Sequence, residues 1–566
     1  MFSYRTALVL GVLLAVGTVM PALGADGNGK TTTVEGQTSI KAAAPVYVPL
    51  DSWVYPALER LAALGYIKDA PSDFGPWTRS ECKRQVEEAS DAIARQERSG
   101  SPKSDYQEAV RLLPQLEAEF AEERRGTMAR IESLYARGTE IAGTPLTDSY
   151  HFGQTISNDF GRPYDSGFNA IAGISGYATA GRFSAYFRGE YQQAPGRPAN
   201  SPQVQDFIAA ADSNPVQAPT PVAATRRFQP LEMYVGAQLG FENITVGQQA
   251  LWWGPGADSA FAFSDNAAPF DMIRFQQRNP LTLPGPLKRL GKARTEFLFG
   301  ELSGHHWPPH PLVNAQKIAI DLPGDIEFGF TRSAFFAGAG HPLSLGSFAN
   351  SLFSTSSTGT TFAYGDPGDP GDRHSGFDFR WYVPKLQHRV MVYSDSYADD
   401  DPNPIDNPKR SAWGPGIYIS RVPGLPHLDL RAETYSSWMY REDEGGQFMY
   451  YNGEYHDSYT NAGNLLGSWI GRDSRAYVGS STYWFSAKSR VQAQYRQIKA
   501  ASGFLPGGGT QTDFGVTGQW SPRPEWLISA QLQGERYYIP LLGSPRQDVV
   551  ASLGVTFYPT DWIWRR

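Results

Sequence analysis

The sequence predicts a mainly β protein, in which an eighteen-stranded antiparallel transmembrane β-barrel follows a small α-helical domain. Apolar and polar residues alternate one by one in short segments over most of the chain, and turn residues separate these segments. Short and long connections alternate between the segments, which is typical of barrels in bacterial outer membranes. The chain also begins like an exported protein.

The first residues have the pattern of a secretory signal peptide. Arg5 precedes an apolar run from Ala7 to Val19, and the small residues up to Ala25 follow it. We therefore expect a signal peptide at 1–25 and a linker at 26–45. No cysteine follows the small residues, which argues against a lipoprotein anchor, and Cys82 alone offers no disulfide framework.

Beyond residue 25 no apolar run is long enough for a helix to span a bilayer. The segment Ile326 to Phe336 instead shows the alternation of a strand: Phe328 and Phe330 lie on one face, and Glu327 and Thr331 lie on the other. Because only every second residue of a barrel strand faces lipid, a membrane barrel shows no long apolar run.

The connections support a barrel of eighteen strands. Short turns, such as 181–182, 323–325 and 486–489, follow even-numbered strands, and long connections, such as 194–227, 339–374 and 439–474, lie between them. The alternation requires that 272–275 is a strand and that 465–471 belongs to an external loop. The predicted strands are 149–160, 168–181, 183–193, 228–240, 241–254, 269–277, 295–304, 312–323, 326–338, 375–385, 388–398, 412–424, 428–438, 475–486, 490–500, 510–522, 526–540 and 548–559.

Charged residues fall on one face of these strands. Phe183 and Phe187 are expected to face lipid, whereas Arg188 and Glu190 are expected to face the lumen, because a charge that faces lipid is costly. A soluble sandwich would show the same alternation, but its hairpins would be of similar length on both sides.

Residues 46–147 are expected to form a helical periplasmic domain, and 148–566 the barrel. Helices are predicted from about Ser52 to Gly65, over 78–96 and 104–123, and over 128–136. The segment from Val48 to Glu81 resembles a single surface-layer-homology-like repeat on Trp53, Tyr55, Leu58, Leu61, Gly65, Tyr66 and Thr78-Arg79-Ser80-Glu81. This resemblance implies that Thr78, Arg79 and Glu81 contact a cell-wall polymer. The alternative is a helical bundle that only packs at the barrel mouth.

The segment Leu251-Trp252-Trp253-Gly254-Pro255-Gly256 is expected at the external end of a strand. Paired tryptophans at this position can stack on sugar rings. Tryptophans at a barrel rim are also ordinary residues of the interfacial aromatic girdle. Trp252 and Trp253 are therefore candidates for polysaccharide binding, with the girdle as the alternative.

The predicted external loop 436–459 combines aromatic and acidic side chains. Trp438, Tyr440, Tyr450 and Tyr451 are candidates for sugar binding, because aromatic rings beside carboxylates suit sugars. The acids of this loop could also hold Ca²⁺, and a solvated loop over the barrel mouth is the structural alternative.

Metal and cofactor sites receive little support. His305, His306 and His310 have the spacing of no zinc motif. The acidic run 366–372 would form a weak Ca²⁺ site only with ligands from elsewhere in the chain. We predict no cofactor and no metal site.

Enzymatic and nucleic-acid functions are not indicated. Glu190, Glu327 and Glu433 could pair as glycosidase carboxylates, but arginines on the same faces suggest ordinary ion pairs in the lumen. A net charge of -7 without a basic stripe argues against nucleic acid as a partner. The chain is therefore not expected to be an enzyme.

The sequence resembles the capsule assembly Wzi family. The resemblance rests on Gly247 to Gly256, on Thr295 to His305 and on Phe328 to Arg332. It implies a non-enzymatic outer-membrane barrel, with its N-terminal domain in the periplasm, that retains a capsular or another envelope polysaccharide at the cell surface. The expected partners are this polysaccharide, outer-membrane lipids and a peptidoglycan-linked polymer, and a monomer is expected. The alternative is a porin or channel that its N-terminal domain tethers to the cell wall.

Overall fold

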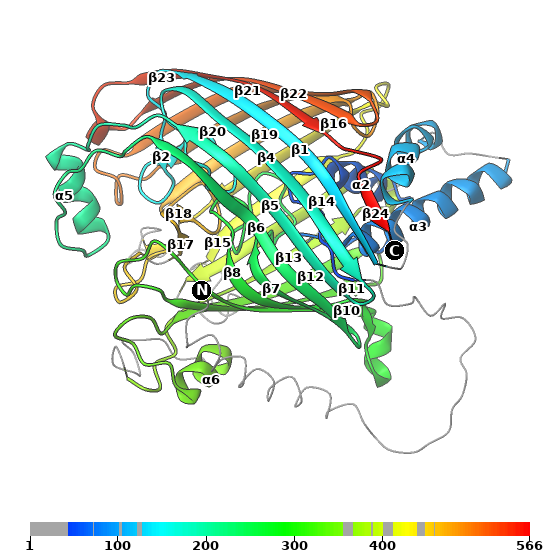
Figure 1. Ribbon diagram of the computed structural model, residues 1–566, viewed down its shortest axis with the longest axis horizontal. Coiled ribbons are helices and arrows are strands. Elements are labelled where there is room, and N and C mark those ends of the chain that lie inside the picture. The colour runs from blue at the N-terminus through cyan, green and yellow to red at the C-terminus, as the bar shows by residue number, and fades with distance from the viewer. Residues whose placement is uncertain are drawn as a thin grey trace. The chain divides into compact units, whose positions relative to one another are not determined.

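The computed structural model describes residues 44–71, 73–100, 105–121, 127–354, 366–386, 389–399, 411–438, 448–457 and 459–565 (Figure 1). The predicted signal peptide lies outside these residues, as does nearly all of the predicted linker.

Eighteen long antiparallel strands form a closed barrel. It closes because the first strand pairs with the second strand on one side and with the last on the other. The long strands are β1 Thr127–Ala142, β4 Gly167–Ala180, β5 Phe183–Ala194, β6 Thr225–Leu239, β7 Glu242–Gln249, β8 Phe270–Gln277, β10 Lys292–Glu301, β11 Leu312–Leu322, β12 Ile326–Phe336, β13 Asp372–Tyr382, β14 Val390–Asp399, β15 Ser411–Ile419, β16 Leu428–Ser436, β19 Ser474–Trp484, β20 Arg490–Ala500, β21 Gly509–Arg523, β22 Trp526–Tyr538 and β23 Arg546–Phe557.

Six short strands accompany the barrel. Two of them are additional pieces of the barrel wall: β9 Leu281–Thr282 pairs with β10, and β24 Ile563–Arg565 pairs with β1. The other four form two small hairpins, β2 Thr147–Asp148 with β3 Gly153–Gln154 and β17 Thr460–Asn461 with β18 Asn464–Leu465.

The strand count was predicted correctly, but the first strand was not. The helix expected over 128–136 is instead part of β1, so the barrel begins at Thr127 rather than at residue 148. Residues 149–160, predicted as the first strand, form the β2–β3 hairpin and a loop. Pairing with β4 and β23 on its two sides holds 127–142 extended, and this pairing overrides a local pattern that also fits a helix.

The predicted faces of the strands are confirmed. Phe183 and Phe187 are exposed on the outer surface, whereas Arg188 and Glu190 are buried. The weak strand predicted at 272–275 is also present, within β8. Most connections alternate as predicted, so the barrel has a short-turn end and a long-loop end. The connection 278–291 between β8 and β10 is an exception, because it is a longer connection at the short-turn end that contains β9 and a 3-10 turn.

Three helices lie at the short-turn end: α2 Val54–Ala63, α3 Arg79–Arg98 and α4 Tyr106–Phe120. They match the first three predicted helices within a few residues. Gly65 follows α2 with a positive φ of 81°, a conformation that glycine adopts without strain. The apolar face of these helices packs on the inner barrel wall at Tyr393, Tyr418 and Trp484.

Arg60 joins α2 to the barrel. Its guanidinium is fully buried and lies 2.9 Å from Asp429 and 3.0 Å from Glu108 on α4. It also donates hydrogen bonds to the carbonyl oxygens of Ser420 and Pro426 in the turn between β15 and β16. These contacts dock α2 in the mouth of the barrel, and α3 and α4 extend outward from it (Figure 1).

Two further helices, α5 Pro202–Ala211 and α6 Leu345–Phe353, lie in long loops. Short 3-10 turns cover Gly285–Leu290, Pro384–Leu386 and Pro540–Leu542. None of the described helices is both long and apolar enough to cross a membrane.

Candidate functional site

The long loops fold back into the barrel. In the connection 250–269, the backbone amide of Phe261 donates to Asp395 on β14 at 2.8 Å, and that of Ala257 donates to Glu433 on β16 at 2.8 Å. Trp469, from the connection between β16 and β19, donates its indole N–H to the carbonyl oxygen of Asp258. Carboxylates of the inner wall thus hold an apolar cluster within the barrel, which includes Phe261, Tyr450, Tyr459 and Trp469.

Trp252 and Trp253 belong to this interior. The preceding strand β7 ends at Gln249, so both tryptophans belong to the loop 250–269 that folds into the barrel, and not to the strand at its rim. Trp252 is half-buried and pairs through its backbone with Gly75 of the helical segment. Trp253 is buried, and its indole N–H donates to Glu296 at 3.2 Å. The predicted rim position is therefore wrong, because the chain turns inward where the indole finds a buried acceptor.

The aromatic residues of the loop 436–459 occupy different places. Tyr450 is buried; its hydroxyl donates to the carbonyl oxygen of Phe261 and accepts from the amide of Ser468. Tyr451 is half-buried, and its hydroxyl lies 2.6 Å from Ser213 beyond α5. Half-buried Trp438 stacks with the guanidinium of Arg475, whose centre lies 4.0 Å from the ring. Tyr440 lies outside the described residues.

Three exposed aromatic side chains on the described parts of the long loops escaped the sequence analysis: Trp307, Phe353 at the end of α6, and Phe448. Trp307 is 46% exposed and Phe448 is 39% exposed. The amide of Trp307 donates to Asp457, and its carbonyl oxygen accepts from the amide of His456. The ring of Phe448 lies 6.3 Å from that of Tyr451. In the sequence analysis, the histidines around Trp307 were considered only for metal binding. Because Trp307 lies in a long loop, it could also have been named as a candidate for sugar binding.

Charged side chains join three of the long loops in a group that we call the loop clasp: half-buried Asp148 and His151, and buried Asp212 and Arg472. The two ring nitrogens of His151 lie 2.8 Å from Asp148 and 2.9 Å from Asp212, and Arg472 lies 3.1 Å from Asp212. Burial disfavours the imidazolium, but the two carboxylates outweigh it and raise the pKa of His151 to about 10. The clasp is therefore charged at neutral pH, and it fixes the external loops relative to one another.

The three residues predicted to contact a cell-wall polymer are engaged within the protein. Thr78 caps α3 by accepting from the amide of Glu81 at 3.2 Å. Arg79 is buried and lies 3.0 Å from Glu119 and 3.4 Å from Glu132. Glu81 pairs with Arg84 at 2.7 Å. These contacts favour the alternative in which the helices only pack on the barrel.

Comparison with known proteins identifies the family. The model of the family described as capsule assembly protein Wzi matches residues 136–549, which is more than half of the chain. The chain belongs to the Wzi family. It is an outer-membrane β-barrel, as predicted from the sequence.

One related protein is distant in sequence from this chain. An uncharacterized 55.8 kDa protein in the cps region of Klebsiella pneumoniae is 25% identical over 179 residues, which is 31% of this chain and 34% of that protein. The chain thus matches only about a third of that relative's length.

The solved structure of Wzi from Escherichia coli has the same fold. It superimposes with a TM-score of 0.65 at 16% identity, over 91% of this chain and all of that one. It is described as an outer membrane protein involved in group 1 capsule assembly and as a carbohydrate-binding β-barrel. A BenF-like porin from Pseudomonas fluorescens gives a TM-score of 0.42 at 9% identity, over 76% of this chain and 99% of that one.

Proposed function

We propose that this Wzi-family protein binds exported capsular polysaccharide on its long loops and retains it at the cell surface, without catalysis. The observation that carries the proposal is the exposure of two aromatic side chains, Trp307 and Phe448, each on a long loop that contacts other parts of the protein. Exposed rings can stack on the apolar faces of sugars. Weak contacts of this kind add up along a repeating polymer.

The lengths of the connections support one orientation of the barrel in the outer membrane. Outer-membrane barrels keep their short turns in the periplasm and their long loops outside. The long loops are then at the cell surface, and helices α2 to α4 are in the periplasm at the opposite mouth. In this orientation the exposed aromatic side chains would face an exported polymer at the cell surface.

The candidate residues predicted from the sequence divide into two groups. Trp438 and Tyr451 are half-buried beside arginines, and we keep them as secondary contacts with polysaccharide. Trp253 and Tyr450 are buried, and we assign to them the support of the loops. Half-buried Trp252 meets the helical segment in the lumen and is assigned to the same support.

The barrel interior supports binding rather than transport or catalysis. Residues 250–269 and the helical segment occupy the two ends of the lumen, which argues against the alternative of a channel. The lumen carboxylates considered for catalysis hold other groups instead: Glu190 binds Arg162, Glu327 binds Arg380, and Glu433 holds the 250–269 loop. We therefore propose a binding protein and no enzyme.

A binding measurement tests the proposal. The purified barrel, in detergent, is titrated with capsular polysaccharide isolated from the same bacterium. The double variant W307A/F448A is expected to bind about tenfold more weakly, because two stacking contacts are lost. Val216→Ala is the matched control, since Val216 is an exposed non-aromatic residue in another long loop. Equal binding by the double variant and the wild type would refute the site.

A further inference from the structure

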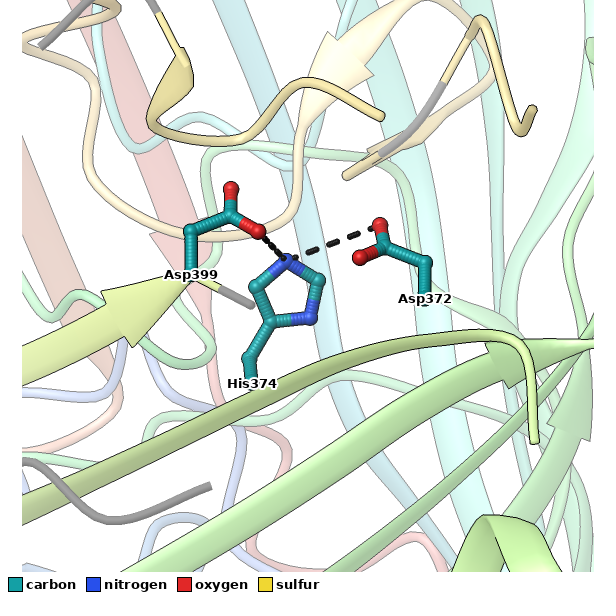
Figure 2. A group of neighbouring side chains, drawn as sticks. All are labelled: Asp372, His374 and Asp399. Atoms are coloured by element: carbon teal, nitrogen blue, oxygen red, sulfur yellow. Dashed lines mark ion pairs between the residues drawn. The ribbon is translucent and has the colours of Figure 1, made fainter. Parts of the chain in front are cut away.

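Three potential metal ligands meet at the long-loop end of two neighbouring strands (Figure 2). Asp372 is the first residue of β13, and Asp399 is the last residue of β14. His374 is directly paired with Asp399 in the register of the two strands. Asp372 and His374 are two residues apart, so they lie on the same face of β13.

All three side chains are buried, and one nitrogen faces both carboxylates. The Nε2 atom of His374 lies 3.2 Å from Asp399 and 3.6 Å from Asp372. The three donor atoms all lie within 4.8 Å of one another. Ligand atoms at about 2.1 Å from a tetrahedral ion are about 3.4 Å apart, which these separations bracket.

The loop clasp also contains a histidine between two carboxylates, but its donor atoms do not converge on one point. In that group each ring nitrogen of His151 serves its own carboxylate, at 2.8 and 2.9 Å. At Asp372, His374 and Asp399, by contrast, the Nε2 atom of His374 alone faces both carboxylates, at longer distances, and this nitrogen carries at most one hydrogen. Convergence of donor atoms on one point is the geometry of a metal site rather than of a hydrogen-bonded pair.

Aromatic neighbours fix the imidazole. The ring of Tyr397 stacks on that of His374 at 5.5 Å, and Tyr459 meets it edge-on at 4.8 Å. The hydroxyl of Tyr397 lies 2.7 Å from Ser333 and 2.6 Å from that of Tyr459. Ligands held by such surrounding contacts are already oriented for a metal ion.

We propose that Asp372, His374 and Asp399 bind one divalent transition-metal ion, with Zn²⁺ as the best match. An imidazole nitrogen with two carboxylate oxygens suits Zn²⁺ or Mn²⁺ better than Ca²⁺, which prefers oxygen ligands alone. A divalent ion with a neutral imidazole and two carboxylates also forms an uncharged unit, which suits a buried position. The ion would join the long-loop ends of β13 and β14.

The sequence pointed to one of the three ligands, Asp372. Asp372 ends the acidic run 366–372, for which ligands from elsewhere in the chain were required. The other two ligands are His374, two residues later on β13, and Asp399 on the neighbouring strand β14. This spacing matches no sequence motif for metal binding. The nitrogen ligand changes the expected ion from Ca²⁺ to a transition metal.

Metal content tests the proposal on the full-length protein, purified without a histidine tag. After equilibration with Zn²⁺ and gel filtration, the wild type is expected to hold about one zinc ion per chain. His374→Gln and Asp399→Asn are expected to weaken binding by about tenfold or more. His151→Gln, in the other cluster of one histidine and two aspartates, is the matched control and should keep the zinc.

Thermal unfolding gives an independent measurement. Zn²⁺ should raise the Tm of the wild type, and a chelator should reverse the rise, because ligand binding stabilises the folded state. Neither effect is expected for Asp372→Asn or Asp399→Asn, which decide the outcome if His374→Gln does not fold. A folded wild type without stoichiometric zinc, or a His374→Gln variant that keeps it, would overturn the proposal in favour of an imidazolium between two carboxylates.

Discussion

At the scale of single residues, buried polar contacts hold the external loops in one arrangement. The loop clasp is the clearest example, because His151 carries its charge between Asp148 and Asp212. Removing the imidazole leaves Asp148 without its cation, and Asp212 with Arg472 alone. His151→Gln should therefore lower the free energy of unfolding by about 3 kcal/mol near pH 6, as measured by denaturant titration.

This effect should depend on pH. The pKa of His151 is about 10 in the folded protein against an ordinary value of 6.5, so its stabilisation is complete below pH 6.5 and disappears as the pH rises through 10. His151 also holds the pKa of Asp148 below its ordinary value of 3.8, although burial opposes this shift, so acid weakens the contact only below that pH. A His151→Gln effect that is equal at pH 6 and pH 11 would contradict this assignment.

Tyr450 provides a second test at this scale. Its hydroxyl connects the carbonyl oxygen of Phe261 with the amide of Ser468, and both partners are buried. Tyr450→Phe should cost about 1–3 kcal/mol of stability, because both partners lose a hydrogen bond. Polysaccharide binding by the folded variant should be unchanged, since the ring lies inside the barrel. Weaker binding at unchanged stability would instead assign Tyr450 to the binding surface.

At the scale of elements, the docking of α2 in the barrel mouth depends on Arg60. Arg60→Met removes the partner of Asp429 and Glu108, and it should weaken docking by about 3–5 kcal/mol. Faster proteolysis between α2 and α4 in the folded barrel would measure this loss. Arg95→Met, at an exposed position of α3, is the matched control and should leave proteolysis unchanged.

The sequence predicted those elements whose local pattern agrees with their final environment. Helices α2 to α4 and most strands have such patterns, and the alternation of turns gave the correct number of strands. The strand β1 was missed because its residues fit a helix, and only its pairing with β4 and β23 holds it extended.

The candidate site was predictable only in part, because a loop pattern does not tell which side chains turn inward. Trp253 and Tyr450 lie in segments whose composition is typical of a binding loop. Both side chains are nevertheless buried in the barrel, where they donate hydrogen bonds to buried acceptors on other segments. Trp307 is exposed, although the histidines beside it had been considered only for metal binding. The metal ligands come from two strands whose register no local motif reveals.

At the scale of the whole molecule, the protein is a barrel that loops and helices occupy from both ends. We therefore expect no large, steady conductance when the purified protein is reconstituted in a planar bilayer. Single-channel recording measures this directly, with a known porin as the positive control. A stable conductance for ions or sugars would favour the channel alternative over retention of polysaccharide.

Retention of polysaccharide on living cells tests the central claim most directly. The measurement is the amount of capsular polysaccharide bound to cells and released into the medium, in a strain that lacks this protein and carries either the wild type or W307A/F448A. The account predicts that the wild type restores cell-bound polysaccharide, whereas the double variant, at equal abundance in the outer membrane, leaves most of it in the medium. Equal retention by the strain without the protein and by the wild type would contradict the account.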